Sequence, residues 1–375
     1  MSRLARYETA LQSLNTRGRL RALSPVQGHD FASNDYLGLA RSDILRDAAK
    51  DALTRGVPTG AGASRLLRGN HPEHEALETE AAAFFGTQAA LYVAGGFTAN
   101  VAMLSTLPAH NDLILHDALI HASSHDGMRL GRAEAQSFLH NDVADAEIKA
   151  NEWRAAGNTG LIWIVIESLY SMDGDLAPMA DIVALADRLD AMIIADEAHA
   201  TGVFGDLGRG MSHPYAHQEN IVTLHTCGKS LGSFGGLICA DTRLINTLIN
   251  KSRGFIFSTA PAPLNAAITR AALRVLAQDP QRQKRLQQRI KHVNQGLGRN
   301  THPSQIIPII LGDDKRTMSV ASDLQSRGFD IRGIRPPTVP RGTSRLRLSI
   351  TLNPDDQAVD DMVNAITNID AEVAK

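Results

Sequence analysis

The middle of the chain alternates short apolar runs with amphipathic helical patterns, and this alternation constrains the fold more than any other feature. Residues 161–167 (LIWIVIE) have the composition of a buried strand, and residues 191–195 that of the next strand. Between them, residues 180–189 carry apolar side chains at helical spacing. Strands that alternate with crossover helices form parallel sheets covered by helices on both faces. We therefore expect an α/β domain built on a mostly parallel sheet.

A second expected unit lies nearer the N-terminus. Residues 72–85 form a predicted helix, because Pro72 suits its first position and Gly86 suits its end. A strand over residues 89–93 and a helix over residues 97–107 follow. Two further runs, 221–224 and the alternating 345–350, predict strands.

The last hundred residues have a different pattern, which predicts a smaller α+β domain. A long helical region begins near Pro263 and is interrupted at Pro280. Strands are expected over residues 306–311 and 330–334, with a helix over residues 316–326 and another after Pro354. The predicted division is an N-terminal helix and arm (1–45), a large domain (46–270) and a small C-terminal domain (271–375).

Composition excludes several classes of protein. The 375 residues include 38 Lys and Arg against 40 Asp and Glu, a net charge of −2, which argues against a nucleic-acid-binding surface or a basic membrane anchor. A membrane-spanning helix needs about 20 apolar residues, and the apolar runs here are much shorter. Two cysteines are too few for a disulfide framework, so the expected location is the cytoplasm.

The N-terminal segment predicts a short helix that docks on another surface. Leu4, Tyr7, Leu11 and Leu14 fall on one helical face. The arginines of this segment are also typical of a transit peptide, but Glu8 argues against that interpretation.

Lys229 is the first candidate for chemistry. It follows a predicted strand in the Gly-rich segment TCGKSLGSFGG (226–236). A lysine in a confined, apolar setting loses its proton more easily than one in water, and the neutral amine can form a Schiff base with an aldehyde. A lysine in a surface loop is the alternative interpretation of this segment alone.

The segment around Lys229, together with residues 196–199, also resembles nucleotide-binding motifs. Gly228-Lys229-Ser230 is similar to the end of a P-loop, and DEAH at 196–199 is similar to a helicase motif. A P-loop requires a glycine five residues before Gly228, and Thr223 stands there instead. The two motifs also occur in the wrong order, so a nucleotide hydrolase is disfavoured.

Asp196 is the second candidate, because it ends an apolar strand where a carboxylate is costly unless it is paired. The protonated ring nitrogen of a cofactor is one suitable partner, and an arginine or a helix N-terminus is the structural alternative. His199, three residues on, could hydrogen-bond the same ligand. Gly95 and Gly96 separate a predicted strand from a helix, where free backbone N–H groups can bind a phosphate.

Histidines and arginines supply further candidates. His121 and His125, in a cluster with His110 and His116, are four residues apart, which places both on one face of a helix. No Glu or Cys spacing completes a metal site, so no metal is expected, and an imidazole stacked on a cofactor ring is the competing use. Arg345 and Arg347 lie on one face of a strand, which we expect to be exposed and able to clamp a carboxylate.

These parts match what pyridoxal 5'-phosphate (PLP) requires: a Schiff-base lysine, an acidic partner for the ring nitrogen and an anchor for the phosphate. The chain also resembles the α-oxoamine synthases, PLP enzymes with the aspartate-aminotransferase fold (fold type I), and within them the biotin-pathway members. The resemblance extends from about residue 31 to 353. Its segments are FASNDYLGLA (31–40), GAGASRLLRGNHPEHEALE (60–78), GGFTAN (95–100), HDALIHASSHDGMRLG (116–131), ESLYSMDGD (167–175), DEAHATGVFG (196–205), HTCGKSLGSFGG (225–236), FSTAP (257–261) and PRGTSRLRLSI (340–350).

The resemblance implies a role for each matching residue. Lys229 would be the Schiff-base lysine, Asp196 the partner of the ring nitrogen, and His121 a catalytic group stacked on the ring. His199 would hydrogen-bond the phenolic oxygen of the ring. The others implied at the cofactor are Ser171, Thr226, the amides of Gly96 and Phe97, and Ser258 and Thr259 from the partner subunit of a homodimer. Those implied at the substrates are Asn34 and Arg347 for the amino acid, with Arg345 as the alternative, and Arg21 for the acyl group.

The resemblance also implies a reaction. L-alanine would condense with pimeloyl-CoA, or with pimeloyl-ACP on its carrier protein, to give 8-amino-7-oxononanoate, CO2 and the free thiol. Another member of the family, which joins glycine or serine to acetyl-, succinyl- or long-chain acyl-CoA, is the nearest alternative. A PLP-binding protein without catalysis is a further alternative, but such a subunit would be expected to lack the lysine.

Overall fold

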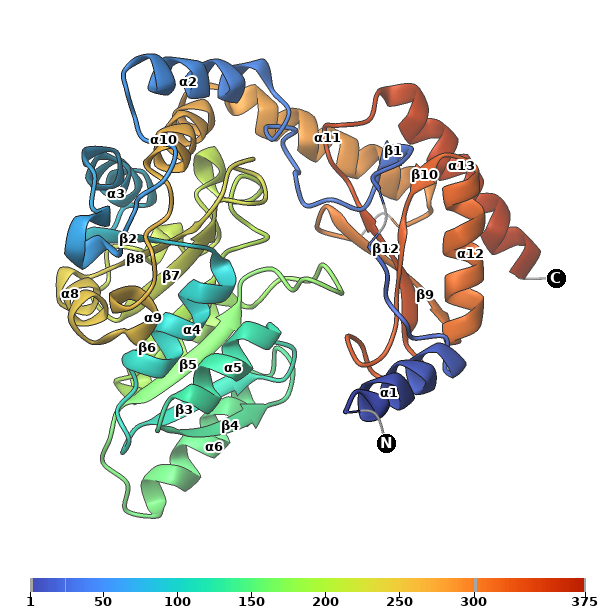
Figure 1. Ribbon diagram of the computed structural model, residues 1–375. Helices are drawn as coiled ribbons and strands as arrows, with labels where there is room; N and C mark the ends of the chain where they lie inside the picture. Colours follow the sequence, from blue (N-terminus) through green and yellow to red (C-terminus); the bar gives the residue numbers. More distant parts are fainter. Residues whose placement is uncertain (1–2, 24, 300–301, 374–375) are drawn as a thin grey trace.

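A seven-stranded sheet forms the centre of the larger of the two bodies of the molecule (Figure 1). The computed structural model describes residues 3–23, 25–299 and 302–373. The strands run in the order β2-β8-β7-β6-β5-β3-β4, and β8 is antiparallel to both of its neighbours. The other pairs are parallel, so the predicted mostly parallel sheet is confirmed. The strands are β2 (Ala89–Val93), β3 (Leu113–Asp117), β4 (Glu134–Phe138), β5 (Ile162–Glu167), β6 (Met192–Asp196), β7 (Ile221–Thr226) and β8 (Gly236–Ala240).

Helices cover both faces of this sheet, because the buried strands carry apolar side chains on both sides. In β5, Ile164 and Ile166 pack toward α6 and α7, whereas Trp163 and Val165 pack toward the opposite layer. The helices of the two layers are α4 (Gly96–Thr106), α5 (Ala122–Leu130), α8 (Thr242–Lys251) and α9 (Arg253–Ile256) on one face, and α6 (Val143–Ala155) and α7 (Met179–Leu189) on the other.

A third group of helices covers β2 and β8 on the face opposite α4 and α8. It consists of α2 (Asp43–Thr54), α3 (Pro72–Phe85) and α10 (Pro263–Gln278). Helix α3 has the predicted bounds, with Pro72 in its first turn and Gly86 in the left-handed conformation at φ 78°. The His71 ring accepts a hydrogen bond from the Glu73 amide and caps its N-terminus. Short helical turns complete this body at Arg65–Gly69, Asp206–Gly208 and His213–Tyr215.

The smaller body is built on a three-stranded antiparallel sheet. Its order is β11-β12-β9, so the arginine-bearing strand β12 is central. The elements are α11 (Pro280–Gly296), β9 (Ile306–Gly312), α12 (Asp314–Ser326), β11 (Arg332–Ile334), β12 (Ser344–Ser349) and α13 (Asp356–Val373). The N-terminal arm joins this body, since β1 (His29–Asp30) pairs with β10 (Phe329–Asp330). Helix α11 runs from one body to the other (Figure 1), and the domain boundaries at residues 45 and 270 stay a prediction.

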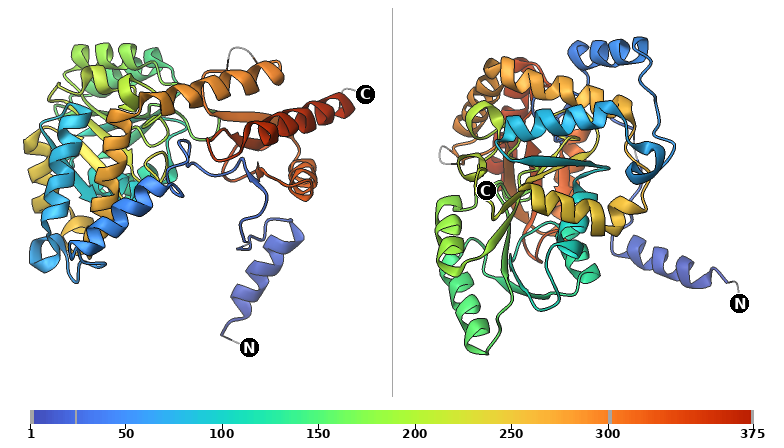
Figure 2. Two further views of the ribbon diagram at one scale, coloured as in Figure 1. Left: turned by 90° about the horizontal axis from the view of Figure 1, so that it is seen from above. Right: turned by 90° about the vertical axis from the view of Figure 1, so that its left-hand side faces the viewer.

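Helix α1 (Ala5–Thr16) projects away from both bodies (Figure 2). The expected apolar face is present, but none of the described side chains of α1 is buried. The arm that follows forms an ion pair with the smaller body, since the Arg19 guanidinium lies 3.2 Å from the Asp314 carboxylate. The docking role of this helix is therefore not realised within one chain. Within the described part of the chain, no helix is long and apolar enough to cross a membrane.

Candidate active site

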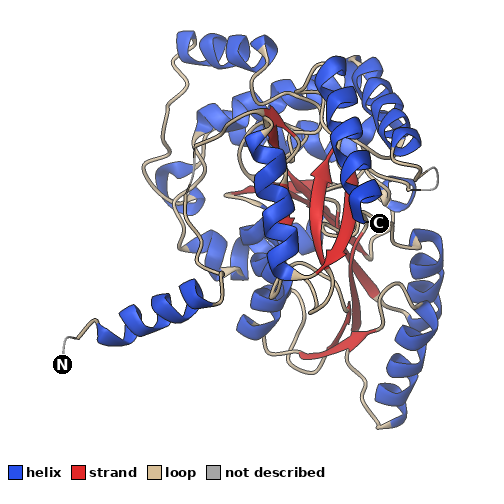
Figure 3. Cartoon of the chain, turned by 90° about the vertical axis from the view of Figure 1, so that its right-hand side faces the viewer, coloured by secondary structure: helices blue, strands red, loops and turns tan. Residues whose placement is uncertain are grey.

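The ends of three parallel strands bring polar side chains to one edge of the large sheet. Glu167, Asp196 and Thr226 are the last residues of β5, β6 and β7, and Glu167 pairs in register with Asp196. Figure 3 shows the strands (red) among the helices that cover them. A cavity of about 140 Å³ opens at the ends of β5, β6 and β7, and ligands of open α/β sheets bind at this edge. Its lining residues are Gly96, Phe97, Asn100, His121, Ser123, Glu167, Asp196, Ala198, His199, Thr226 and Lys229.

Lys229 presents its amine to this cavity. The Nζ atom lies 2.6 Å from Nε2 of His199. Burial lowers the pKa of Lys229 to about 8, against the opposing effect of the nearby acidic groups, Asp196 first and then Glu167. About a tenth of the amine is therefore neutral at pH 7, far more than for a lysine in water, and attack on an aldehyde requires the neutral form.

Asp196 is held on both of its carboxylate oxygens. Asn100 donates from Nδ2 to Oδ2 at 2.8 Å, and the Ala198 amide donates to Oδ1 at 2.9 Å. Glu167 stands beside it as a second carboxyl group. Burial, followed by repulsion from Asp196, raises the pKa of Glu167 well above its usual value, and its Oε1 has no hydrogen-bond partner. Asp196 is thus the hydrogen-bonded carboxyl group of the pair, and burial favours the neutral form of Glu167.

His121 does not lie within a helix beside His125, as the spacing predicted. It is the N-cap of α5, where its Nδ1 accepts from the Ser123 amide at 3.2 Å and meets the Ser123 hydroxyl at 2.7 Å. The strand β3 ends four residues before His121, and the turn between β3 and α5 leaves His121 outside the helix. Asn100 also donates to Ser123 at 3.0 Å, so one amide side chain supports both Asp196 and the histidine cap.

The turn at Gly95 and Gly96 has the geometry of an anion cradle. Helix α4 begins at Gly96, so its first amides have no partner within the helix. A Cβ at Gly96 would lie 3.3 Å from the Thr226 hydroxyl, so a side chain there would crowd the cradle. Phe97 stands at its mouth and is 53% exposed. A phosphate group suits this helix N-terminus.

Arg345 and Arg347 are buried, not exposed as predicted, because their side of β12 packs against the loop after β5. They are only 4% and 7% exposed. Arg345 forms an ion pair with Asp173 of that loop. Arg347 donates to three neutral groups: the Ser171 carbonyl at 2.7 Å, the Ser349 hydroxyl at 2.8 Å and Asn34 Oδ1 at 3.0 Å. Arg347 therefore keeps a positive charge that can pair with a carboxylate.

The other candidates lie outside this cavity. Ser258 and Thr259 are exposed and line a small separate hollow with Arg65 and Thr98. Arg21 is exposed in the N-terminal arm. Across the described ranges, no group of three or more His, Cys, Asp and Glu side chains could hold a metal ion.

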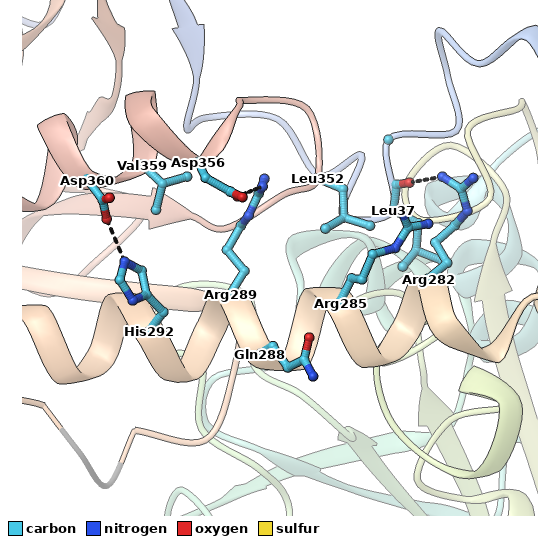
Figure 4. A pocket seen from close by; sticks show the side chains of 11 residues that line it. Leu37, Arg282, Arg285, Gln288, Arg289, His292, Leu352, Asp356, Val359 and Asp360 are labelled. Carbon is cyan, nitrogen blue, oxygen red and sulfur yellow. Dashed lines mark hydrogen bonds and ion pairs between the residues drawn. The ribbon is translucent and has the colours of Figure 1, made fainter.

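A wider cavity of about 600 Å³ lies between α11 and α13 (Figure 4). Its basic side chains are already engaged, since Arg289 pairs with Asp356 at 2.5 Å and His292 with Asp360 at 2.6 Å. Arg282 donates to the Leu37 carbonyl at 2.9 Å. This cavity contains none of the predicted reactive residues, so the smaller one is the candidate active site.

The smaller cavity fits PLP. It combines a primary amine, a fixed carboxylate, an imidazole and a helix N-terminus, which match the aldehyde, ring nitrogen, ring and phosphate of that group. It also contains buried polar atoms with no partner in the protein, Oε1 of Glu167 and Oδ1 of Asn100. Such atoms are costly unless a ligand or water meets them.

Comparison with known proteins identifies the family. Residues 27–366 match the model of the family described as aminotransferase class I and II. An 8-amino-7-oxononanoate synthase from Anaeromyxobacter dehalogenans (strain 2CP-1) is 38% identical, over 96% of this chain and 94% of that protein. One from Geobacter sulfurreducens is 37% identical, over 97% of each chain. The chain belongs to the α-oxoamine synthases of the class I and II aminotransferase family.

Solved structures agree with this family. A serine palmitoyltransferase from S. paucimobilis, solved with a bound PLP–myriocin aldimine, superimposes with a TM-score of 0.88 at 26% identity over the whole of both chains. The 8-amino-7-oxononanoate synthase from Francisella tularensis has a TM-score of 0.76 at 24% identity, over 93% of this chain and 99% of that one, and shows the shared fold. The predicted family and fold class are confirmed.

Sequence reasoning missed three residues of this α-oxoamine synthase site: Tyr36, Asn100 and Glu167. All three lie inside segments that carry the family resemblance, and Glu167 also ends a strand whose neighbour ends in Asp196. The position of Glu167 at the end of a buried strand could have identified it as a site residue. Tyr36 and Asn100 had none, because their partners are distant in sequence.

Proposed function

We propose that this protein condenses L-alanine with a pimeloyl thioester, with loss of CO2, to give 8-amino-7-oxononanoate and the free thiol in biotin biosynthesis. It is a PLP-dependent C-acyltransferase. The observation that carries the proposal is the placement of the Lys229 amine and Asp196 in one cavity, together with relatives of this activity that match nearly the whole chain. The family and the neighbours solved with PLP support the cofactor.

Different residues of the site would bind the cofactor and transfer the proton. Lys229 would hold the cofactor through its aldehyde, and its free amine would take the proton from Cα of alanine and later return one. Asp196 would face the ring nitrogen, and the amides of Gly96 and Phe97 would hold the phosphate. When bound, PLP supplies an electron sink for the pair left on Cα.

The remaining residues orient ring and substrate. His121 would lie over the ring, His199 would hydrogen-bond its phenolic oxygen, and Ser171 and Thr226 would flank it. Arg347 and Asn34 bind the alanine carboxylate. Overall, a bond forms between Cα and the acyl carbon, the thiol departs with the C–S electron pair, and the carboxylate leaves as CO2.

A second copy of the chain would complete the site. We propose a homodimer in which Ser258 and Thr259 of one copy reach the phosphate bound by the other, which accounts for their exposure outside the cavity of their own chain. Arg21 would approach the acyl substrate. A cytoplasmic location is supported by two buried cysteines, Cys227 and Cys239, that are both free thiols.

The assignment of substrates is tested by a screen. Purified protein loaded with PLP is incubated with L-alanine, glycine or L-serine, each against pimeloyl-, acetyl-, succinyl- and palmitoyl-CoA, and the product mass is measured. We expect the largest turnover with L-alanine and pimeloyl-CoA. The solved serine palmitoyltransferase neighbours make L-serine with palmitoyl-CoA the alternative pair, and turnover confined to that pair would contradict the proposal.

The carboxylate site gives a separate prediction. Arg347→Ala should raise the half-saturating concentration of L-alanine about 10- to 100-fold, because a hydrogen bond to a charged group contributes about 1.5–3 kcal/mol. The measurement is the L-alanine dependence of turnover at saturating acyl thioester.

Arg345→Ala is the matched control, since this arginine is buried on the same strand face but already paired with Asp173. It should lower the thermal midpoint and leave the L-alanine dependence nearly unchanged. A larger L-alanine effect in Arg345→Ala than in Arg347→Ala would transfer the role to Arg345.

A further inference from the structure

A continuous line of hydrogen bonds joins the Lys229 amine to the Arg347 guanidinium. Lys229 Nζ lies 2.6 Å from His199 Nε2, and the other ring nitrogen, Nδ1, lies 2.6 Å from the Tyr36 hydroxyl. That hydroxyl also lies 3.0 Å from Asn34 Oδ1, which accepts from Arg347 Nη2 at 3.0 Å. The line connects the reactive amine with the charge proposed to bind the substrate carboxylate.

Tyr36 is the middle of this line and has a single proton for two acceptors. It is 0% exposed, and burial raises the pKa of its hydroxyl, so the proton stays on the oxygen. Its two possible acceptors are Nδ1 of His199 and Oδ1 of Asn34. The hydroxyl can serve only one of them at a time.

His199 has the same restriction. Burial, and then the positive charge of Lys229, lower the pKa of His199 well below its usual value, so the ring is neutral and carries one N–H. If protonated Lys229 donates to Nε2, the proton sits on Nδ1 and Tyr36 donates to Asn34. If Nε2 carries the proton, Nδ1 accepts from Tyr36, and Asn34 loses that donor. The protonation of one end thus determines the donors at the other.

The backbone around Tyr36 is held by two hydrogen bonds. Its carbonyl accepts from the Leu352 amide at 3.0 Å. The next carbonyl, of Leu37, accepts from Arg282 of α11 at 2.9 Å (Figure 4). These contacts anchor the segment to the small body and hold the hydroxyl between its partners.

We infer that Tyr36 is a positioning residue that couples occupancy of the carboxylate site at Asn34 and Arg347 to the hydrogen bonding of His199 and Lys229. The inference rests on the proposed function and deepens it. Tyr36 distinguishes an amino acid from a simple amine, because only a ligand with a carboxylate engages both ends of the line. The hydroxyl transfers no group to substrate and acts through its two neighbours.

Tyr36→Phe tests this coupling, since phenylalanine keeps the ring packing and removes only the hydroxyl. The probes are L-alanine and ethylamine, which is L-alanine without its carboxylate. Each is titrated against the PLP-loaded protein without acyl thioester, and binding is read from the cofactor absorbance. We expect the preference for L-alanine over ethylamine to fall about 10-fold, the effect of one lost buried hydrogen bond. In an Arg347→Ala background the same change should add little to the loss of preference.

Tyr92→Phe is the matched control, because Tyr92 is equally buried and its hydroxyl donates to the Phe234 carbonyl. It should leave the preference unchanged. An equal weakening of both probes in Tyr36→Phe, with the preference intact, would overturn the inference, since the hydroxyl would then act on the cofactor side alone. Wild-type protein that binds PLP but shows no response to L-alanine would instead overturn the proposed function.

Discussion

Replacement of Lys229 with alanine should abolish the covalent bond between protein and cofactor and lower turnover by at least about 1,000-fold, since the residue acts both as nucleophile and as general base. No second amine lines the cavity as the structure describes it, so no other lysine can substitute. The pKa of Lys229, lowered to about 8 by burial, makes this amine suited to both tasks.

Three measurements check this result. The absorbance of the PLP-loaded protein should lose the band of the lysine-bound cofactor. Borohydride reduction and peptide mass analysis should find the label on residue 229 of the wild type and nowhere in Lys229→Ala. Lys50→Ala, in which an exposed lysine of α2 is removed, is the control and should behave as wild type. Retained turnover in Lys229→Ala would reject the assignment of this residue.

Asp196→Asn should have the second largest effect, a fall in turnover of about 100- to 1,000-fold, as is typical when one fixed electrostatic contact to the reacting system is lost. The amide has nearly the same shape but no negative charge for a protonated ring nitrogen. It also offers one acceptor oxygen where Asp196 now accepts from both Asn100 and Ala198. The cofactor should still bind covalently, because Lys229 is unchanged, and its absorbance should shift.

Asp241→Asn is the matched control for Asp196→Asn. Asp241 is also buried, but it caps α8 and pairs with Arg243 away from the cavity. Asparagine still offers an acceptor oxygen for the cap but loses the ion pair with Arg243, so this variant should lower the thermal midpoint slightly and keep its turnover. If Asp196→Asn retained turnover and Glu167→Gln lost it, the neighbouring carboxyl group at the end of β5 would be the partner of the ring.

Local signals in the sequence were sufficient for many elements. Pro72 and Gly86 bound α3 as predicted, because fixed φ at a helix start and positive φ after its end are properties of single residues. The apolar runs of β2, β5 and β6 also predicted strands to within a residue or two. Strand β8 was missed: the glycines before it suggested only a loop, and it pairs antiparallel with both neighbours, which no pattern within its own five residues specifies.

The sequence by itself determined the set of reactive groups at the ends of buried strands and the family to which they belong. Only the tertiary structure distinguished Arg345 from Arg347, since the difference is the Asp173 carboxylate of a loop more than 170 positions away. It also placed Tyr36 between His199 and Asn34. Periodicity reports which side of a strand or helix a residue occupies, whereas the partner of a buried charge or hydroxyl depends on which distant segments the packing brings within hydrogen-bond distance.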